Sequence, residues 1–137
     1  MSESRAINRY VGSSPRKMRL VIDLIRGKSV PEALTILHYS PKHPAKVAEK
    51  VLRSAVSNFQ NKDQEGRTEI ESLFVKAAYV DPGPSVKRIM PAPMGRAYRI
   101  VKRSNHVTIV VDKRVQRASR KTEPAQAAKA TKKTSKE

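Results

Sequence analysis

The stretch from Pro82 to His106 constrains the fold of this chain more than any other part of the sequence. It contains six lysine or arginine residues and no acidic residue, and prolines interrupt it at positions 82, 84, 91 and 93. On either side of it, from Ile70 onward and up to Val111, short runs of β-forming residues predict two long antiparallel strands. Because proline cannot donate a ladder hydrogen bond, we expect an extended and poorly paired hairpin arm over about residues 80–106.

The charge of the whole chain favours a polyanionic partner. Lysine and arginine number 29 among 137 residues against 12 acidic residues, which gives a formal net charge of +17. Solubility alone needs far less charge than this, whereas the phosphate backbone of a nucleic acid would neutralise it. Only 4% of the residues are aromatic, so charge and shape rather than base stacking should dominate recognition.

Composition also limits the chemistry that we expect. The chain has no cysteine, which excludes disulfides and thiolate zinc sites and is compatible with the reducing cytoplasm. It has no apolar run long enough for membrane insertion, so we expect a soluble, intracellular protein. The three histidines, His38, His43 and His106, show no metal-ligand or nucleophile–base spacing. We therefore expect no enzyme activity, no metal and no cofactor.

Three amphipathic helices are predicted ahead of the arm. Ser14 and Pro15 suit the start of the first helix and Gly27 its end. A capping box from Ser29 to Glu32 predicts the start of the second, and a third follows Pro44 as far as about residue 61. The positions expected to face the core recur at a spacing of three and four residues: Met18, Val21, Ile22, Ile25, Val30, Ala33, Leu34, Leu37, Ala48, Leu52, Ala55 and Phe59.

The chain is expected to form one RNA-binding domain over residues 1–114, followed by a flexible basic tail over residues 115–137. The tail holds seven basic and two acidic residues and lacks apolar periodicity, so it cannot fold alone. A loop is predicted from Asn61 to Glu69. The first helix begins with Arg16, Lys17 and Arg19, where the helix dipole favours acidic residues, and a local rule broken in this way indicates a functional surface.

Two blocks of the sequence resemble the bacterial form of the large-subunit ribosomal protein family twenty-two. The first block is Ser13–Val21 followed by Asp23–Lys28, and the second begins with Val80–Pro84. The second block continues through Lys87–Pro91, Gly95–Ala97, Lys102–Arg103 and the strand His106–Val111. In order and spacing the two blocks cover most of residues 5–114.

The resemblance implies an α+β fold, with three helices packed on a small antiparallel sheet and a long protruding β-hairpin. It implies a structural constituent of the large ribosomal subunit that binds 23S ribosomal RNA, contacts neighbouring large-subunit proteins, supports subunit assembly and lines the nascent-peptide exit tunnel with its hairpin. The RNA-binding residues would be Arg9, Arg16, Lys17, Arg19, Lys87, Arg88, Arg96, Arg99, Lys102, Arg103 and His106. The tunnel-lining residues, past which the nascent polypeptide moves, would be Ile89, Met90, Pro91, Ala92, Pro93, Met94 and Gly95.

A second hypothesis is an architectural DNA-binding protein. Such proteins also combine a helical body with basic β-arms that carry a proline wedge. The two hypotheses differ in the partner that retains the protein after cell lysis, which is the large subunit in one case and DNA in the other.

Overall fold

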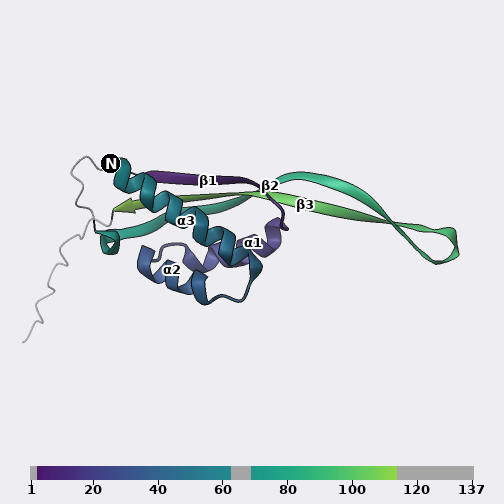
Figure 1. Cartoon of the computed structure of the whole chain (residues 1–137), viewed down its shortest axis with the longest axis horizontal. Coiled ribbons are helices and arrows are strands. Elements are labelled where there is room, and N and C mark those ends of the chain that lie inside the picture. Colours follow the sequence, from purple (N-terminus) through teal and green to yellow (C-terminus); the bar gives the residue numbers. More distant parts are fainter. Residues whose placement is uncertain (1–2, 63–68, 114–137) are drawn as a thin grey trace, which may run out of the picture.

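The computed structural model describes residues 3–62 and 69–113, so the predicted tail and most of the predicted loop at residues 61–69 lie outside the described residues. The helices lie against one face of a sheet, and two of the strands continue beyond the body as a thin hairpin (Figure 1). This arrangement confirms the α+β fold class. The elements are β1 (Ser4–Val11), α1 (Pro15–Ile25), α2 (Val30–Tyr39), α3 (His43–Lys62), a 3-10 turn (Ile70–Ser72), β2 (Leu73–Pro91), a second 3-10 turn (Pro93–Gly95) and β3 (Ala97–Lys113).

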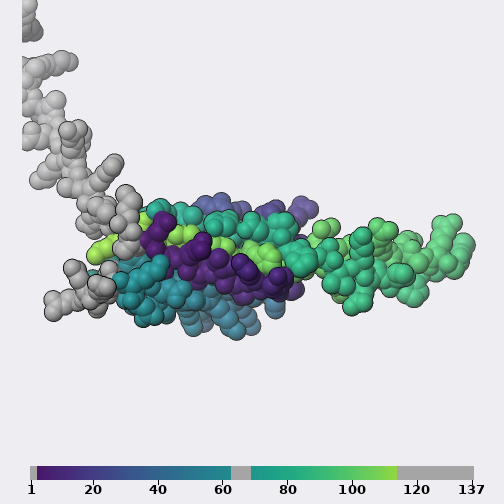
Figure 2. All heavy atoms as spheres, turned by 90° about the horizontal axis from the view of Figure 1, so that it is seen from above, coloured from purple at the N-terminus to yellow at the C-terminus, as the bar shows by residue number. Residues whose placement is uncertain are grey.

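The sheet has the strand order β1-β3-β2 and is antiparallel throughout. Successive rows of paired residues alternate between its two faces. The row of Ala6, Ile109 and Ala78 is buried under the helices, whereas Ile7 and Tyr79 in the next row are 44% and 45% exposed. Figure 2 shows the three strands side by side from above. The sheet therefore has one covered face and one open face.

The predicted helices are confirmed, but the predicted side-chain caps are wrong. Of the twelve positions expected to face the core, all are buried except Leu34, which packs partly buried against the core. Ser14 and Ser29 stand at the N-cap positions, yet neither side chain makes a capping hydrogen bond. The carboxylate of Glu32 pairs with Lys28 instead. Gly27 ends α1 as predicted, with a left-handed φ of 77°.

The first strand, β1, was not predicted from the sequence. Its residues show little hydrophobic alternation, because the inward positions Ser4 and Ala6 are small. Two side chains of α3 protect its outer edge: the Nδ2 of Asn58 donates to the carbonyl of Arg5 at 3.2 Å, and the Nζ of Lys62 donates to that of Glu3 at 3.3 Å. Tertiary contacts with α3 and pairing with β3 therefore define β1.

The arm is regularly paired, so the expectation of a poorly paired stretch is wrong. The ladder between β2 and β3 runs from the pair Leu73–Lys113 to the pair Pro91–Ala97. It can do so because each strand of a two-stranded ribbon has a free edge, where a proline removes no ladder hydrogen bond. The register of the ladder shifts once within the arm, between Pro82 and Ser85.

Gly83 allows this register shift, and replacing it with alanine should destabilise the root of the arm. A Cβ at this position would lie 2.5 Å from the Oγ of Ser104 and 3.2 Å from its carbonyl carbon. We expect the Gly83→Ala variant to lose about 1–3 kcal/mol of unfolding free energy, the typical cost of overpacking. Urea denaturation measures this loss. Gly12→Ala is the control, because nothing lies within 4 Å of a Cβ there; equal stability of the two variants would contradict the prediction.

Candidate nucleic-acid interface

Positive charge along the arm is distributed at one cation per pair of facing residues. The two residues of a pair lie on the same face of the ribbon, and successive pairs alternate faces at intervals of roughly 3.4 Å. The cations therefore alternate between the two faces, and no two of them stand directly opposite each other. Five consecutive pairs follow this pattern: Ser85–Arg103, Val86–Lys102, Lys87–Val101, Arg88–Ile100 and Ile89–Arg99.

These cations have no partner of opposite charge within the part of the chain that the structure describes. All ion pairs found there lie in the body, for example Arg26 with Asp23 at 3.0 Å. Lys76 in the body is such a paired cation: its hydrogen bonds to Glu3, the stronger influence, and to Asp112 raise its pKa above the ordinary value. In contrast, the six arm cations are exposed and unpaired, and are therefore available to an external anion: Lys87, Arg88, Arg96, Arg99, Lys102 and Arg103.

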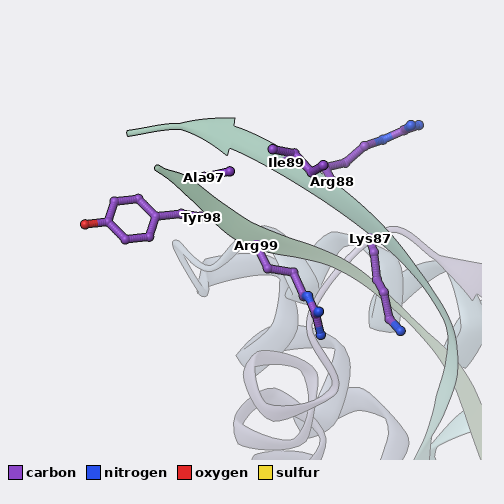
Figure 3. Close-up of a pocket in the computed structure, with 6 residues that line it drawn as sticks. All are labelled: Lys87, Arg88, Ile89, Ala97, Tyr98 and Arg99. Carbon is purple, nitrogen blue, oxygen red and sulfur yellow. The ribbon is translucent and has the colours of Figure 1, made fainter. Parts of the chain in front are cut away.

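A groove near the end of the arm brings several predicted site residues together. Its volume is about 600 Å³, and it is lined by Lys87, Arg88, Ile89, Ala97, Tyr98 and Arg99. Figure 3 shows the side chains of Lys87 and Arg99 on one side of the ribbon and that of Arg88 on the other. The lining combines cations with an aromatic ring and aliphatic groups, which are the groups that contact the phosphates and bases of RNA.

The tip of the arm differs from its shaft because it carries no charge from Ile89 to Gly95. Ile89 is 80% exposed and Met94 is 93% exposed. The chain reverses through left-handed φ angles of 62° at Met94 and 69° at Gly95, and the amide of Ala92 donates to the carbonyl of Arg96 at 2.9 Å. The tip therefore presents an uncharged apolar surface at the end of a cationic shaft.

The predicted RNA-binding residues outside the arm occupy separate places. Arg9 is exposed on β1, and Arg16 is exposed at the start of α1. Lys17 lies beside the arm root, where it shares an open pocket with Lys102 and Arg103. His106 has a structural contact: its Nδ1 accepts a hydrogen bond from the amide of Tyr10 at 3.0 Å, which holds Tyr10 at a left-handed φ of 58°.

Arg19 and Arg26 bind the edge of β2, a role that sequence reasoning missed. The Nη2 of Arg19 donates to the carbonyl of Val80 at 3.2 Å. The Nε and Nη2 of Arg26 donate to the carbonyl of Ala78 at 3.2 and 2.8 Å. The basic residues at the start of the first helix indicated only a functional surface, because the sequence does not show which strand edge lies beside them.

The role of Arg26 gives a testable distinction between stability and RNA affinity. Arg26→Met should lower the unfolding free energy by about 1–3 kcal/mol, because the carbonyl of Ala78 loses a charged donor. Its effect on RNA affinity should be small. Thermal melting and RNA binding measured on the same sample check both parts, with Arg16→Met as the exposed control. A large loss of affinity at unchanged stability would instead place Arg26 in the interface.

Other kinds of site find no support in the described residues. Over residues 3–62 and 69–113, no group of three histidine, cysteine, aspartate or glutamate side chains lies close enough to hold a metal ion. Among the helices described, none has both the length and the apolar character needed to span a membrane.

An α+β body with a thin hairpin of unpaired cations defines a protein suited to binding a polyanion. Residues 6–112 match the family described as ribosomal protein L22p/L17e. The chain belongs to this family, which consists of structural ribosomal proteins rather than enzymes. The resemblance seen in the sequence and the expectation of no enzyme activity are both confirmed.

Three bacterial relatives illustrate the match, and each is named large ribosomal subunit protein uL22. The relative from Chlorobaculum tepidum is 55% identical over 111 residues, which are 81% of this chain and 93% of the relative. The relative from Clostridium novyi is 50% identical, with 82% of this chain and 98% of the relative covered. That from Pelotomaculum thermopropionicum is 52% identical, with 80% and 94% covered. The match therefore spans nearly the whole of these relatives.

Proposed function

We propose that this chain is a structural constituent of the large ribosomal subunit in the cytoplasm and binds 23S ribosomal RNA through its arm. The observation that carries the proposal is the series of five residue pairs with one unpaired cation each. A hairpin with free edges and no core of its own needs a partner to stabilise it, and phosphates on both faces supply the missing opposite charge. The relatives are named as proteins of the large ribosomal subunit, which supports the same partner.

The alternation of cations supports contact with RNA on both faces of the arm. Lys87, Arg99 and Arg103 lie on one face, and Arg88 and Lys102 lie on the other. Cations on one face are two pairs apart, or roughly 7 Å. A ribbon bound in this way bridges two RNA segments, which is how the protein would support subunit assembly. The body remains free for RNA and for neighbouring large-subunit proteins.

The uncharged tip supports a role in lining the path of the nascent polypeptide. An apolar surface gains little from phosphate contact, whereas it suits a wall along which varied peptide side chains move. Pro91 and Pro93 restrict the backbone, and this favours a fixed wall over a mobile gate. On this proposal Lys87, Arg88 and Arg96 anchor the hairpin in RNA behind the tip.

The architectural DNA-binding hypothesis has less support, because the family match favours the ribosome. Sedimentation of a cell lysate separates the two hypotheses. We expect the chain to cosediment with large subunits through a moderate salt wash and to remain there after DNase treatment. Release by DNase, or recovery with DNA and without large subunits, would overturn the proposed function.

A further inference from the structure

An open pocket lies where the arm joins the body, and it is distinct from the groove near the tip. Its volume is about 760 Å³. Three separate elements line it: α1 contributes Lys17, the start of α3 contributes His43, and β3 contributes Lys102 and Arg103. We infer that this pocket binds a single phosphate group and that the bound phosphate fixes the arm against the body.

The charge of the lining selects an anion. None of the lining residues is acidic, and Lys17, Lys102 and Arg103 are all exposed cations. No ion pair involves these three within the described part of the chain. Cations gathered from α1 and β3 around one concavity repel each other until an anion lies between them. A phosphate is the anion that lysine and arginine bind together most readily.

The local backbone supports the same ligand. Pairing of β1 with β3 ends at the pair Val11–Asn105, so the edge of β3 at residues 101–103 is free to face the pocket. The side chain of Ser14 makes no capping hydrogen bond, and the first turn of α1 has no acidic residue. A bound anion would compensate for the basic residues at the start of this helix, which are otherwise unfavourable there.

The position of the pocket links ligand binding to the orientation of the arm. Asn105 on β3 already joins the arm to the body. Its Nδ2 donates to the carbonyl oxygen of Ser13 at 2.6 Å and to the Oγ of Ser13 at 2.8 Å. Lys102 and Arg103 flank the free edge of β3 from the two faces of the ribbon. A phosphate at this edge, held between them and Lys17 of the body, adds a second connection. This assignment rests on the proposed function: the phosphate in the pocket is one phosphodiester of the bound RNA.

Titration of the full chain with inorganic phosphate, followed by amide NMR at constant ionic strength, tests the pocket. We expect saturable shifts at Lys17, Lys102 and Arg103. The double variant Lys17→Gln with Lys102→Gln should weaken phosphate binding about tenfold, since two charge-assisted contacts are lost. The matched control is Lys87→Gln with Arg99→Gln, which removes the same charge from the groove near the tip. Non-saturable shifts, or equal weakening by both variants, would overturn the inference.

Two further measurements separate the source of the phosphate and its effect on the arm. A short RNA should displace inorganic phosphate from the pocket; saturable phosphate binding without competition would mean that free phosphate is the ligand and would overturn the RNA assignment. The chain has no cysteine, so spin labels can be placed at single introduced cysteines at positions 39 and 94. In the otherwise wild-type chain, the distribution of distances between the two labels should narrow when phosphate is added. In the chain that also carries Lys17→Gln and Lys102→Gln it should stay broad. A distribution that stays broad in both chains would refute the fixing of the arm.

Failure of the phosphate site and failure of the proposed function give different experimental results. If the arm binds RNA with the expected salt dependence but the pocket binds no phosphate, only the inference fails. If the pocket binds phosphate but the chain does not cosediment with large subunits, the proposed function fails and the pocket remains.

Discussion

Replacing Lys87, Arg88, Arg96 and Arg99 with glutamine is expected to flatten the salt dependence of binding to large-subunit RNA. Each phosphate contact contributes roughly 0.7–0.9 to the slope of log affinity against log salt. Four lost contacts should therefore reduce the slope by about three. With the non-electrostatic part unchanged, affinity at 0.1 M salt should fall on the order of a thousandfold relative to the wild type. Fluorescence anisotropy over a series of salt concentrations measures both quantities.

A matched charge control makes this result specific to the arm. Glutamine at Lys42, Lys46, Lys50 and Arg53 removes the same four charges from exposed positions of α3 and of the residue before it. This variant should retain most of the salt dependence. An unchanged slope in the arm variant would show that the arm side chains touch no phosphate. The same loss in both variants would show that the salt dependence is not specific to the arm.

The fold should survive the arm substitutions, which makes the binding data interpretable. No buried hydrophobic residue of the core cluster lies within residues 81–106. The core residues nearest to this segment are Val80 on β2 and Val107 on β3. Residues 81–106 of the arm therefore contribute nothing to the hydrophobic core. Circular dichroism of the variant should show an unchanged helical signal, so that a loss of affinity reports on contacts rather than on unfolding.

The helices could be predicted because each buries a stripe of apolar residues that recur at the helical spacing of three and four. In α1 the residues Met18, Val21, Ile22 and Ile25 are all fully buried, as their spacing indicated. The strand β1 could not be predicted in this way, because it packs through the small residues Ser4 and Ala6. Long-range pairing defines such a strand, and single-sequence periodicity does not contain that information.

The candidate site was predictable in its charge but not in its geometry. The absence of acidic residues from Pro82 to His106 marked the arm, whereas the one-cation-per-pair arrangement depends on the register between β2 and β3. That register follows from the shift between Pro82 and Ser85, which local patterns do not fix. The hydrogen bond of Arg19 to the carbonyl of Val80 was not predictable for the same reason, since it joins residues 61 apart in the sequence. Its assignment to RNA binding stays a prediction.

A photoreactive residue at position 94 is expected to crosslink to a nascent polypeptide stalled on the ribosome. Met94 is 93% exposed at the apex of the tip, and the tip is held out from the body by the paired shaft of β2 and β3. If the shaft is anchored in RNA, the apex is the part of the chain that borders the peptide path. The crosslink yield, measured on ribosomes that carry a radiolabelled stalled chain, should exceed that of the control below by at least about tenfold, because crosslinking requires direct contact and the control position lies on the body.

The control is the same photoreactive residue at position 39, because Tyr39 is 80% exposed but lies at the end of α2 on the body. Exposure is similar at the two positions, so a difference in yield reports their place in the ribosome. Sedimentation must first show that both variants are incorporated into large subunits. If position 94 is incorporated and still yields no crosslink to the nascent chain, the apolar apex is covered by RNA or protein. The cationic shaft would then remain an RNA anchor, and the tip would have no role in the peptide path.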